Sequence, residues 1–145
     1  IMNLLFILQL YMLYYTTQST VTDSQHPIIH IHFNSTEGYS LDDLFHMWIT
    51  HYETKIYFSF VFHTKDIIEI PSIWYVCKMA MFIYSLKLRY PHTHYLRESH
   101  ILIHDAAIQR LLEWTFAIQL PVAPVYIYHS DVFDTTNTPV ATIHP

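Results

Sequence analysis

The stretch that decides the fold is IYFSFVF at residues 56–62, followed after a turn over residues 63–71 by SIWYVCKMAMFIYSLKL at residues 72–88. The first run is rich in aromatic and β-branched residues and predicts a buried strand. The second run has apolar residues at helical spacing and predicts a long helix, which ends before Pro91 because the residue preceding a proline avoids the α region. The stripe that we expect to face the sheet consists of Ile73, Val76, Cys77, Ala80, Ile83 and Tyr84.

Shorter segments of the same two kinds flank this stretch. Runs of apolar and β-branched residues predict further strands, and apolar residues at steps of three and four predict further helices. Asp105 has the character of an N-cap, and Asp42 and Asp43 are acids suited to the first turn of a helix. The predicted strands cover residues 28–33, 99–104 and 124–128, and the predicted helices cover residues 40–55 and 106–119.

This order predicts an α/β fold in a single domain. Strands that alternate with helices favour right-handed crossovers, and therefore a mainly parallel sheet of four or five strands with flanking helices in the order β-α-β-α-β-α-β. We place this domain at residues 28–129, after an apolar N-terminal segment and polar loop (residues 1–27) and before a loose tail (residues 130–145).

The apolar run at residues 1–15 has three interpretations. A membrane-spanning helix needs about 20 apolar residues, and this run is shorter and has no basic flank. A secretory signal needs a positive start and a small-residue cleavage site, and the run has neither. The third interpretation is a terminal helix or strand that packs on the domain.

Composition narrows the classes of function. The chain has 145 residues, of which 52% are hydrophobic and 13% charged, so apolar surface is in excess, which is typical of a protein that contacts a partner or a membrane surface. Its net charge of −5, with 7 basic residues, argues against nucleic-acid binding. A single glycine excludes nearly every glycine-rich phosphate loop. We expect a cytoplasmic location, since the single cysteine fits a reducing compartment.

Three segments carry a resemblance to a known family. They are FSFVFHTKDIIEIPSIWYVCKMAMFIYSLK (Phe58–Lys87), YLRESHILIH (Tyr95–His104) and IQRLLEWTFAIQLPVAPVYIY (Ile108–Tyr128). Together with the order of elements they resemble the STAS (SpoIIAA-like) domain, and they are similar to the Sec14-like CRAL-TRIO fold. The resemblance covers roughly residues 28–129 and includes no catalytic motif.

The STAS resemblance implies a non-enzymatic module that binds partners or nucleotides and is switched, in some members, by phosphorylation of a serine at the start of the helix after the central strand. Ser72 is at about that place, in the phrase Ile70-Pro71-Ser72-Ile73, where the family has an Asp-Ser-Ser-Gly-like phrase. A phosphate there would face the positive end of the helix dipole. Thr64 is the second phosphoacceptor candidate, and the alternative role of Ser72 is a plain N-cap.

The Sec14-like resemblance implies an apolar cavity for a lipid tail. The helix at residues 73–88 is apolar nearly all round, which indicates a helix that is buried on two sides or that binds a partner. The side chains that we expect either at an interface with another protein or around a hydrophobic ligand are Trp74, Tyr75, Met81 and Phe82.

Metal and nucleophile chemistry have weaker signals. His30 and His32 lie on one face of a predicted strand and form a weak candidate pair of metal ligands, but a complete site needs further ligands. Cys77 lies in the middle of a helix, where a buried small hydrophobe is the more ordinary role. We therefore expect no cofactor, no resident metal and no enzyme activity.

The leading hypothesis is a non-catalytic interaction module that acts through the loop at residues 63–72 and the exposed face of the helix at residues 73–88. Its partner would be another protein or a second copy of the chain. The alternative is binding of a lipid or another hydrophobic ligand.

Overall fold

Strands and helices alternate along the chain, and a computed structural model confirms the prediction of an α/β fold with a mainly parallel sheet of four or five strands; the sheet has five. The structure describes residues 26–34, 41–67 and 73–145. The elements are β1 (Ile28–Asn34), α2 (Leu41–Glu53), β2 (Phe58–Asp66), α3 (Ile73–Arg89), β3 (Leu96–Ile103), α4 (Ala106–Ile118), β4 (Val125–His129) and β5 (Ala141–Ile143).

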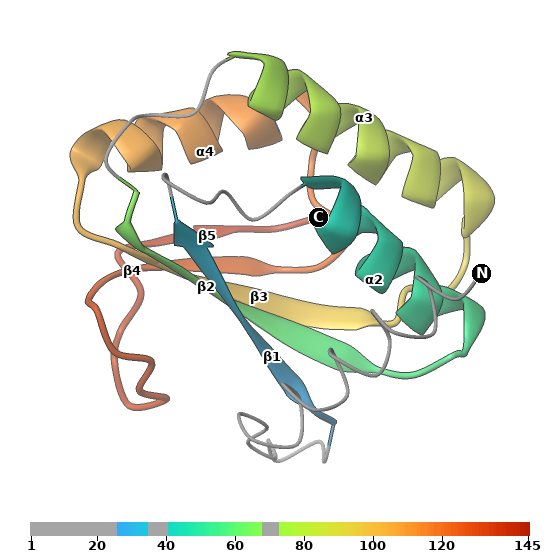
Figure 1. Ribbon diagram of the computed structural model, residues 1–145, viewed down its shortest axis with the longest axis horizontal. Helices are drawn as coiled ribbons and strands as arrows, with labels where there is room; N and C mark the ends of the chain where they lie inside the picture. The colour runs from blue at the N-terminus through green and yellow to red at the C-terminus, as the bar shows by residue number, and fades with distance from the viewer. Residues whose placement is uncertain (1–25, 35–40, 68–72) are drawn as a thin grey trace.

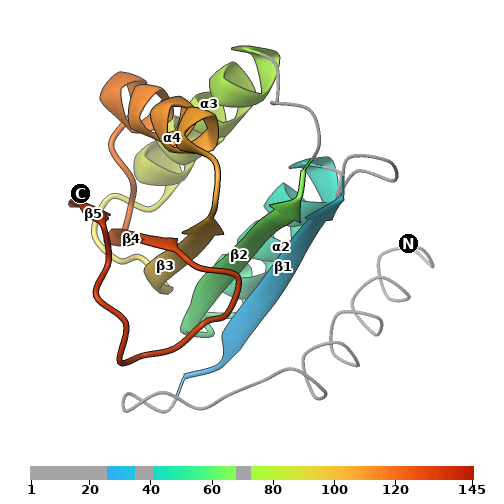
Figure 2. The ribbon, with the colours of Figure 1, turned by 90° about the vertical axis from the view of Figure 1, so that its left-hand side faces the viewer.

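The strands lie in the sheet in the order in which they occur in the chain. β1 to β4 are parallel neighbours, and β5 pairs antiparallel with β4 at the edge. Right-handed crossovers between sequential parallel neighbours place every connecting helix on the same face of the sheet. Figures 1 and 2 show this arrangement, in which α2, α3 and α4 lie on one side of the strands and α3 lies between the other two helices.

The main core fills the space between the helices and the sheet. Alternate residues of each strand point towards the helices because side chains along a strand alternate between its two faces. In β2 these are Phe58, Phe60 and Phe62, of which the first two are fully buried. A second, smaller cluster lies on the opposite face of the sheet and contains Ile28, Val61, Leu102 and Tyr128, with Tyr126 and Phe133 packed against it.

Two strand boundaries differ from the prediction. β2 begins at Phe58, so that Ile56 and Tyr57 are exposed, and it continues to Asp66 through residues predicted to form the turn. β3 begins at Leu96, before the predicted start of that strand at residue 99. In both cases polar residues continue a strand because the neighbouring strand supplies hydrogen-bond partners; His63, for example, is paired with His32 of β1.

The tail also differs from the prediction of a loose segment over residues 130–145. Within it, β5 at residues 141–143 pairs with β4 through Ile143, opposite Val125, and Ala141, opposite Ile127. The connection between β4 and β5 contains an Asp134 side chain that accepts hydrogen bonds from the backbone N–H and the hydroxyl of Thr136. These bonds lower the pKa of Asp134.

Two helix ends have identifiable caps. The predicted N-cap Asp105 is confirmed, since its Oδ1 accepts a hydrogen bond of 2.8 Å from the backbone N–H of Ala107. At the end of α2, Lys55 has a φ of 57°, in the left-handed region. The N–H groups of Lys55 and Ile56 donate to the carbonyls of Tyr52 and His51, which is the Schellman arrangement with a lysine at the position that usually holds glycine.

The face that α3 turns to the sheet agrees only in part with the predicted one. Val76, Ala80, Ile83 and Leu86 are buried, as predicted for the first three, but Ile73 and Tyr84 are exposed and Cys77 is half-buried. The buried stripe of α3 is therefore rotated about the helix axis, away from Ile73, Cys77 and Tyr84 and towards Leu86.

Candidate functional site

The most prominent exposed apolar feature in the described part of the chain is a stripe along the outer side of α3, which we call the outer strip. It consists of Trp74, Cys77, Met81, Tyr84 and Leu88, at alternating steps of three and four residues. Trp74 and Met81 are each 71% exposed, and Tyr84 and Leu88 are 56% and 65% exposed. This spacing is the one by which one helix packs lengthwise against another.

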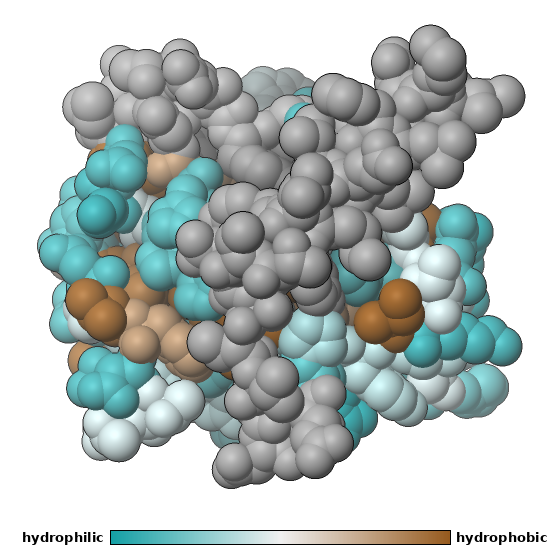
Figure 3. All heavy atoms as spheres, turned by 60° about the horizontal axis from the view of Figure 1, so that its bottom comes forward, coloured by the Kyte–Doolittle hydropathy of each residue, from teal (hydrophilic) through white to brown (hydrophobic). Residues whose placement is uncertain are grey.

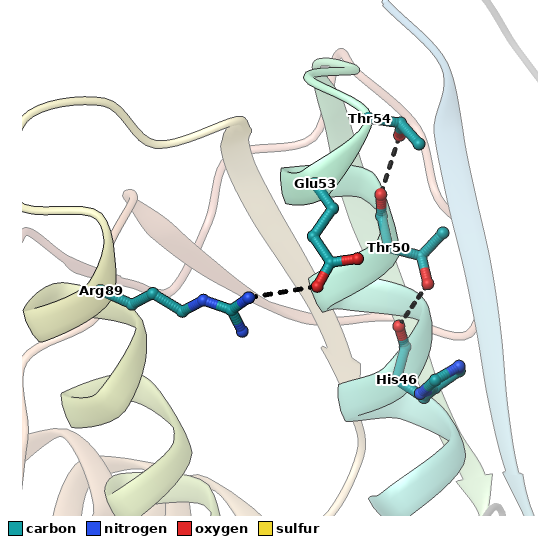
Figure 4. Close-up of polar contacts among 5 residues, drawn as sticks. All are labelled: His46, Thr50, Glu53, Thr54 and Arg89. Atoms are coloured by element: carbon teal, nitrogen blue, oxygen red, sulfur yellow. Dashed lines mark hydrogen bonds and ion pairs between the residues drawn. The ribbon is translucent and has the colours of Figure 1, made fainter.

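Contacts on both sides hold α3 and fix the direction in which this strip points. On the α2 side, the ring of Phe82 stacks on Phe45 at 4.1 Å and meets Trp48 edge-on at 5.0 Å. Arg89 donates a hydrogen bond of 3.2 Å to Glu53 at the far ends of the same two helices (Figure 4). α3 also contacts α4 on its other side. With the sheet below and a helix on either side, the outer strip faces away from the molecule.

α4 extends the apolar surface beside the strip. Trp114 and Ile118 are 62% and 63% exposed, at helical spacing on the outer side of that helix, and Leu120 follows at 50%. The exposed region is thus wider than α3 alone. Isolated exposed apolar residues are ordinary, but several large exposed apolar side chains on two helices that pack against each other are typical of a contact surface.

The four residues predicted to contact a partner or ligand fall into different environments. Trp74 and Met81 belong to the outer strip and are open to solvent. Tyr75 is 41% exposed and also lines an apolar cavity that is partly open to solvent. Phe82 is half-buried against α2, so it supports the position of α3 and is not part of the exposed surface.

Of the two phosphoacceptor candidates, Thr64 is among the described residues and Ser72 is not. Ser72 and the preceding residues 68–71 lie outside the described residues. Thr64 is 5% exposed near the end of β2, and its hydroxyl donates a hydrogen bond of 2.7 Å to the carbonyl of Leu102. A kinase would therefore reach Thr64 only after this part of the strand had separated from β3. The role of either residue in a switch stays a prediction.

An apolar cavity of about 160 Å³ lies between the sheet and the helices. Its lining includes Phe62 and Thr64 from β2, Tyr75 and Val76 from α3, and Val125 from β4. Trp74, Met81 and Phe82 do not line it. Sites for drug-sized ligands measure roughly 300–1,000 Å³, so the volume suits a ligand smaller than a lipid tail.

Histidines gather on the face of the sheet opposite the helices. Nδ1 of His30 is 2.9 Å from Nε2 of His63 on the adjacent strand, and the rings of His32 and His63 stack at 4.1 Å. Burial, followed by the neighbouring His32 and His30 rings, lowers the pKa of His63 to about 4. Burial also lowers the pKa values of His30 and His32. Figure 3 shows hydrophilic and hydrophobic residues side by side on this side of the molecule.

A second polar group on the same face involves β3 and β4. Nε2 of His100 is 3.1 Å from Glu98, and Nδ1 is 2.9 Å from the Tyr128 hydroxyl. The hydrogen bond from His100 is the main cause of a lowered pKa of Glu98. Phe133 contacts the rings of both His30 and His100, so it connects this group with the histidines of β1 and β2.

These histidines do not form a metal site of ordinary composition. In the part of the chain that the structure describes, no group of three or more His, Cys, Asp or Glu side chains is arranged to hold a metal ion. The stacked rings of His32 and His63, tilted by only 9°, have nearly parallel planes, so their nitrogens do not converge on one point. His30 hydrogen-bonds to His63, and that bond needs a proton on one of the two nitrogens.

Three residues of these surfaces were not predicted from the sequence. His63 was assigned to a turn, although the alternation along β2 places it beside His30 and His32 once the strand is extended. Trp114 and Ile118 lie in the predicted helix at residues 106–119, and their helical spacing alone could have indicated an outward-facing pair.

Comparisons with known proteins add no further assignment. No protein-family model, no curated protein and no solved structure matches the chain. Among the described helices, none is both long enough and apolar enough to cross a membrane.

Proposed function

We propose that this chain is a non-catalytic interaction module of STAS-like type that binds a protein partner through the outer strip of α3. The observation that carries the proposal is the exposure of four large strip residues, between 56% and 71%, at the spacing of a helix-packing seam. Trp74, at one end of the strip, is the kind of residue that most often dominates the energy of an interface.

Covering this surface would provide a substantial driving force. Burial of apolar area contributes about 25 cal/mol per Å², and a helix that lays its apolar face on the strip would cover several of these side chains at once. The basic Lys78 and Arg89 lie along one edge of the strip, and α3 contains no acidic residue. A partner with acidic groups at that edge would therefore be favoured.

The STAS-like assignment is part of this proposal. It is supported by the parallel strands joined by helices and by the long helix α3 directly after β2, with Ser72 immediately before that helix in the sequence. Phosphorylation of Ser72 would add negative charge beside the N-terminal end of the outer strip and would change the affinity for a partner. If Ser72→Asp and Ser72→Ala both leave every association unchanged, Ser72 has no switching role.

Binding of a small hydrophobic ligand is a second candidate, and the apolar cavity favours it. A dry cavity of about 150 Å³ lined by aliphatic and aromatic side chains can bind benzene. We expect benzene to raise the midpoint of thermal unfolding, and Val125→Phe, which would fill part of the cavity, to abolish this effect. An equal effect of benzene on both proteins would contradict a specific site.

The interaction surface is tested by a charge placed on the strip. Met81→Glu changes an exposed side chain and should leave the circular dichroism spectrum and the unfolding midpoint unchanged, while weakening association measured by sedimentation velocity and by capture of binding proteins. Val132→Glu is the matched control, because Val132 is 68% exposed in the connection after β4, away from α3. The proposal fails if both variants associate as the unchanged protein does.

A further inference from the structure

The outer strip of α3 is nearly symmetric about its central residue. Trp74 and Leu88 lie seven residues before and after Met81, and both are large, apolar and exposed. Cys77 and Tyr84 lie four residues before and three residues after it, on the side of the strip opposite Arg89, which contacts α2, and therefore on the side towards α4. A strip with this symmetry can pack against a copy of itself.

The packing that this symmetry permits is antiparallel. A two-fold axis through Met81, perpendicular to the helix, places Met81 against Met81 of a second copy and Trp74 against Leu88 of the second copy. Cys77 then lies near Tyr84 of the second copy, so the large tyrosine side chain occupies the space that the small cysteine side chain leaves at the interface. Helices at such a seam approach to about 8–10 Å between their axes.

Charges along the edge of the strip are compatible with this packing. The axis places Lys78 opposite Ser85 of the second copy, so the two lysines do not face each other. α2 and α3 both follow parallel strands and run in the same direction, since Glu53 and Arg89 at their C-terminal ends are 3.2 Å apart. The exposed Asp42 at the start of α2 would therefore lie towards the basic C-terminal end of α3 in the second copy.

The exposed area is of the size that a stable dimer uses. Aromatic side chains bury 150–250 Å² each, so Trp74, Tyr84 and Trp114, each more than half exposed, offer roughly 300–450 Å². With the exposed aliphatic side chains on the same two helices, the total exposed apolar area is on the order of 800 Å² per partner, which is the standard size of an interface. These aliphatic residues are Ile73, Met81, Leu88 and Ile118.

From this self-complementarity we propose that a second copy of the chain occupies the outer strip, giving a two-fold symmetric dimer with antiparallel α3 helices. The proposal rests on the proposed function, because it names the partner of the same surface. It places α4 of each copy beside α4 of the other and leaves the histidine face of both sheets outside the interface.

A cysteine cross-link tests the geometry. In a Cys77→Ser background, Met81→Cys places the only thiol of each copy on the two-fold axis, where mild oxidation should link most of the protein into a disulfide dimer. The unchanged protein is the internal control. Its Cys77 residues would be offset by eight residues, roughly 12 Å along the helix, and a disulfide needs Cα atoms within about 7 Å.

Sedimentation velocity over a wide concentration range separates the outcomes. We expect a reversible dimer, weakened at least about a hundredfold by Met81→Glu, which buries two like charges at the axis, and unaffected by Val132→Glu. A protein that is monomeric at every concentration would overturn the dimer. If that monomer still binds another protein, and Met81→Glu abolishes this binding, the proposed function holds even though the dimer does not form. If the Met81→Glu variant still forms a dimer, the proposed antiparallel arrangement of α3 is wrong. If, in addition, Met81→Glu weakens no association with another protein, the proposed function is wrong as well.

Discussion

His30 and His63 contact each other across two neighbouring parallel strands, with Nδ1 of one ring 2.9 Å from Nε2 of the other. Such a bond needs one donor nitrogen and one acceptor nitrogen. It is therefore lost when both imidazole rings are in the charged form, in which each ring has a proton on both of its nitrogens. The stacked His32 ring adds a third imidazole to the group. The arrangement is therefore stable with neutral rings and is weakened by acid.

The first prediction is a loss of stability in mild acid. The pKa of His63 is about 4 in the folded protein, whereas an unperturbed histidine ring has a pKa of 6.5, so the unfolded chain binds more protons between these values. Folding stability should be highest above about pH 6.5 and should fall as the pH drops towards 4. Denaturant unfolding at a series of pH values measures this slope.

His63→Gln should flatten that pH dependence, since it removes both the titrating ring and its effect on His30 and His32. His92→Gln, at an exposed position after α3, should leave the slope as it is. Equal slopes in the two variants would show that other groups control the acid response, for example the Glu98 carboxyl, whose lowered pKa acts in the same direction at lower pH.

A second prediction concerns Lys55, which has a positive φ of 57° at the end of α2. A residue with a side chain costs about 1 kcal/mol or more in the left-handed region, where glycine has no such penalty. Lys55→Gly should therefore raise the free energy of unfolding by up to about 1 kcal/mol, and Lys55→Val should lower it. Urea denaturation midpoints of the three proteins would be measured, and a destabilised Lys55→Gly would contradict this account.

A third prediction concerns the cavity. Val125→Ile adds one methylene group at a strand position that lines it, so this change should be neutral or stabilising by up to about 0.8 kcal/mol. Val61→Ile makes the same chemical change in β2 at a fully buried position that does not line the cavity, and overpacking there should cost about 1–3 kcal/mol. The midpoints of thermal unfolding of the two variants would be compared. A lower midpoint for Val125→Ile than for Val61→Ile would show that the cavity is not next to Val125.

A fourth prediction concerns the cap of α4. Asp105→Ala removes the carboxylate that accepts from the Ala107 N–H and should cost about 1 kcal/mol of stability, whereas Asp105→Asn keeps an acceptor and should cost less. Because Asp105 is exposed, little packing is lost in either case. Chemical denaturation of both variants would test the ranking, and identical losses would indicate that the cap bond contributes nothing.

The order of strands and helices could be predicted because each has its own period of apolar residues. The exact extent of β2 could not, since His63 to Asp66 are polar and remain in the strand through pairing with β1 and β3. For the same reason, the contact between His30 and His63 depends on the register of two strands, which residue types alone do not specify.

The inward face of α3 was predicted only in part because the helix is apolar nearly all round. Ile73 and Tyr84 fit the inner stripe by composition as well as Leu86 does. Which of them is buried depends on the positions of α2 and α4 on either side, and this is long-range information. The exposed strip thus follows from packing, whereas the excess of apolar residues that produces it is visible in the sequence.

The sequential order of the strands has a consequence for synthesis of the chain. Each parallel strand pairs with the one made just before it, through a single intervening helix, so no later strand has to insert between two that are already paired. Contacts between segments close in sequence form quickly, and chains emerge from the ribosome N-terminal end first. The sheet can therefore grow from β1 outwards while translation proceeds, with β5 closing its last edge.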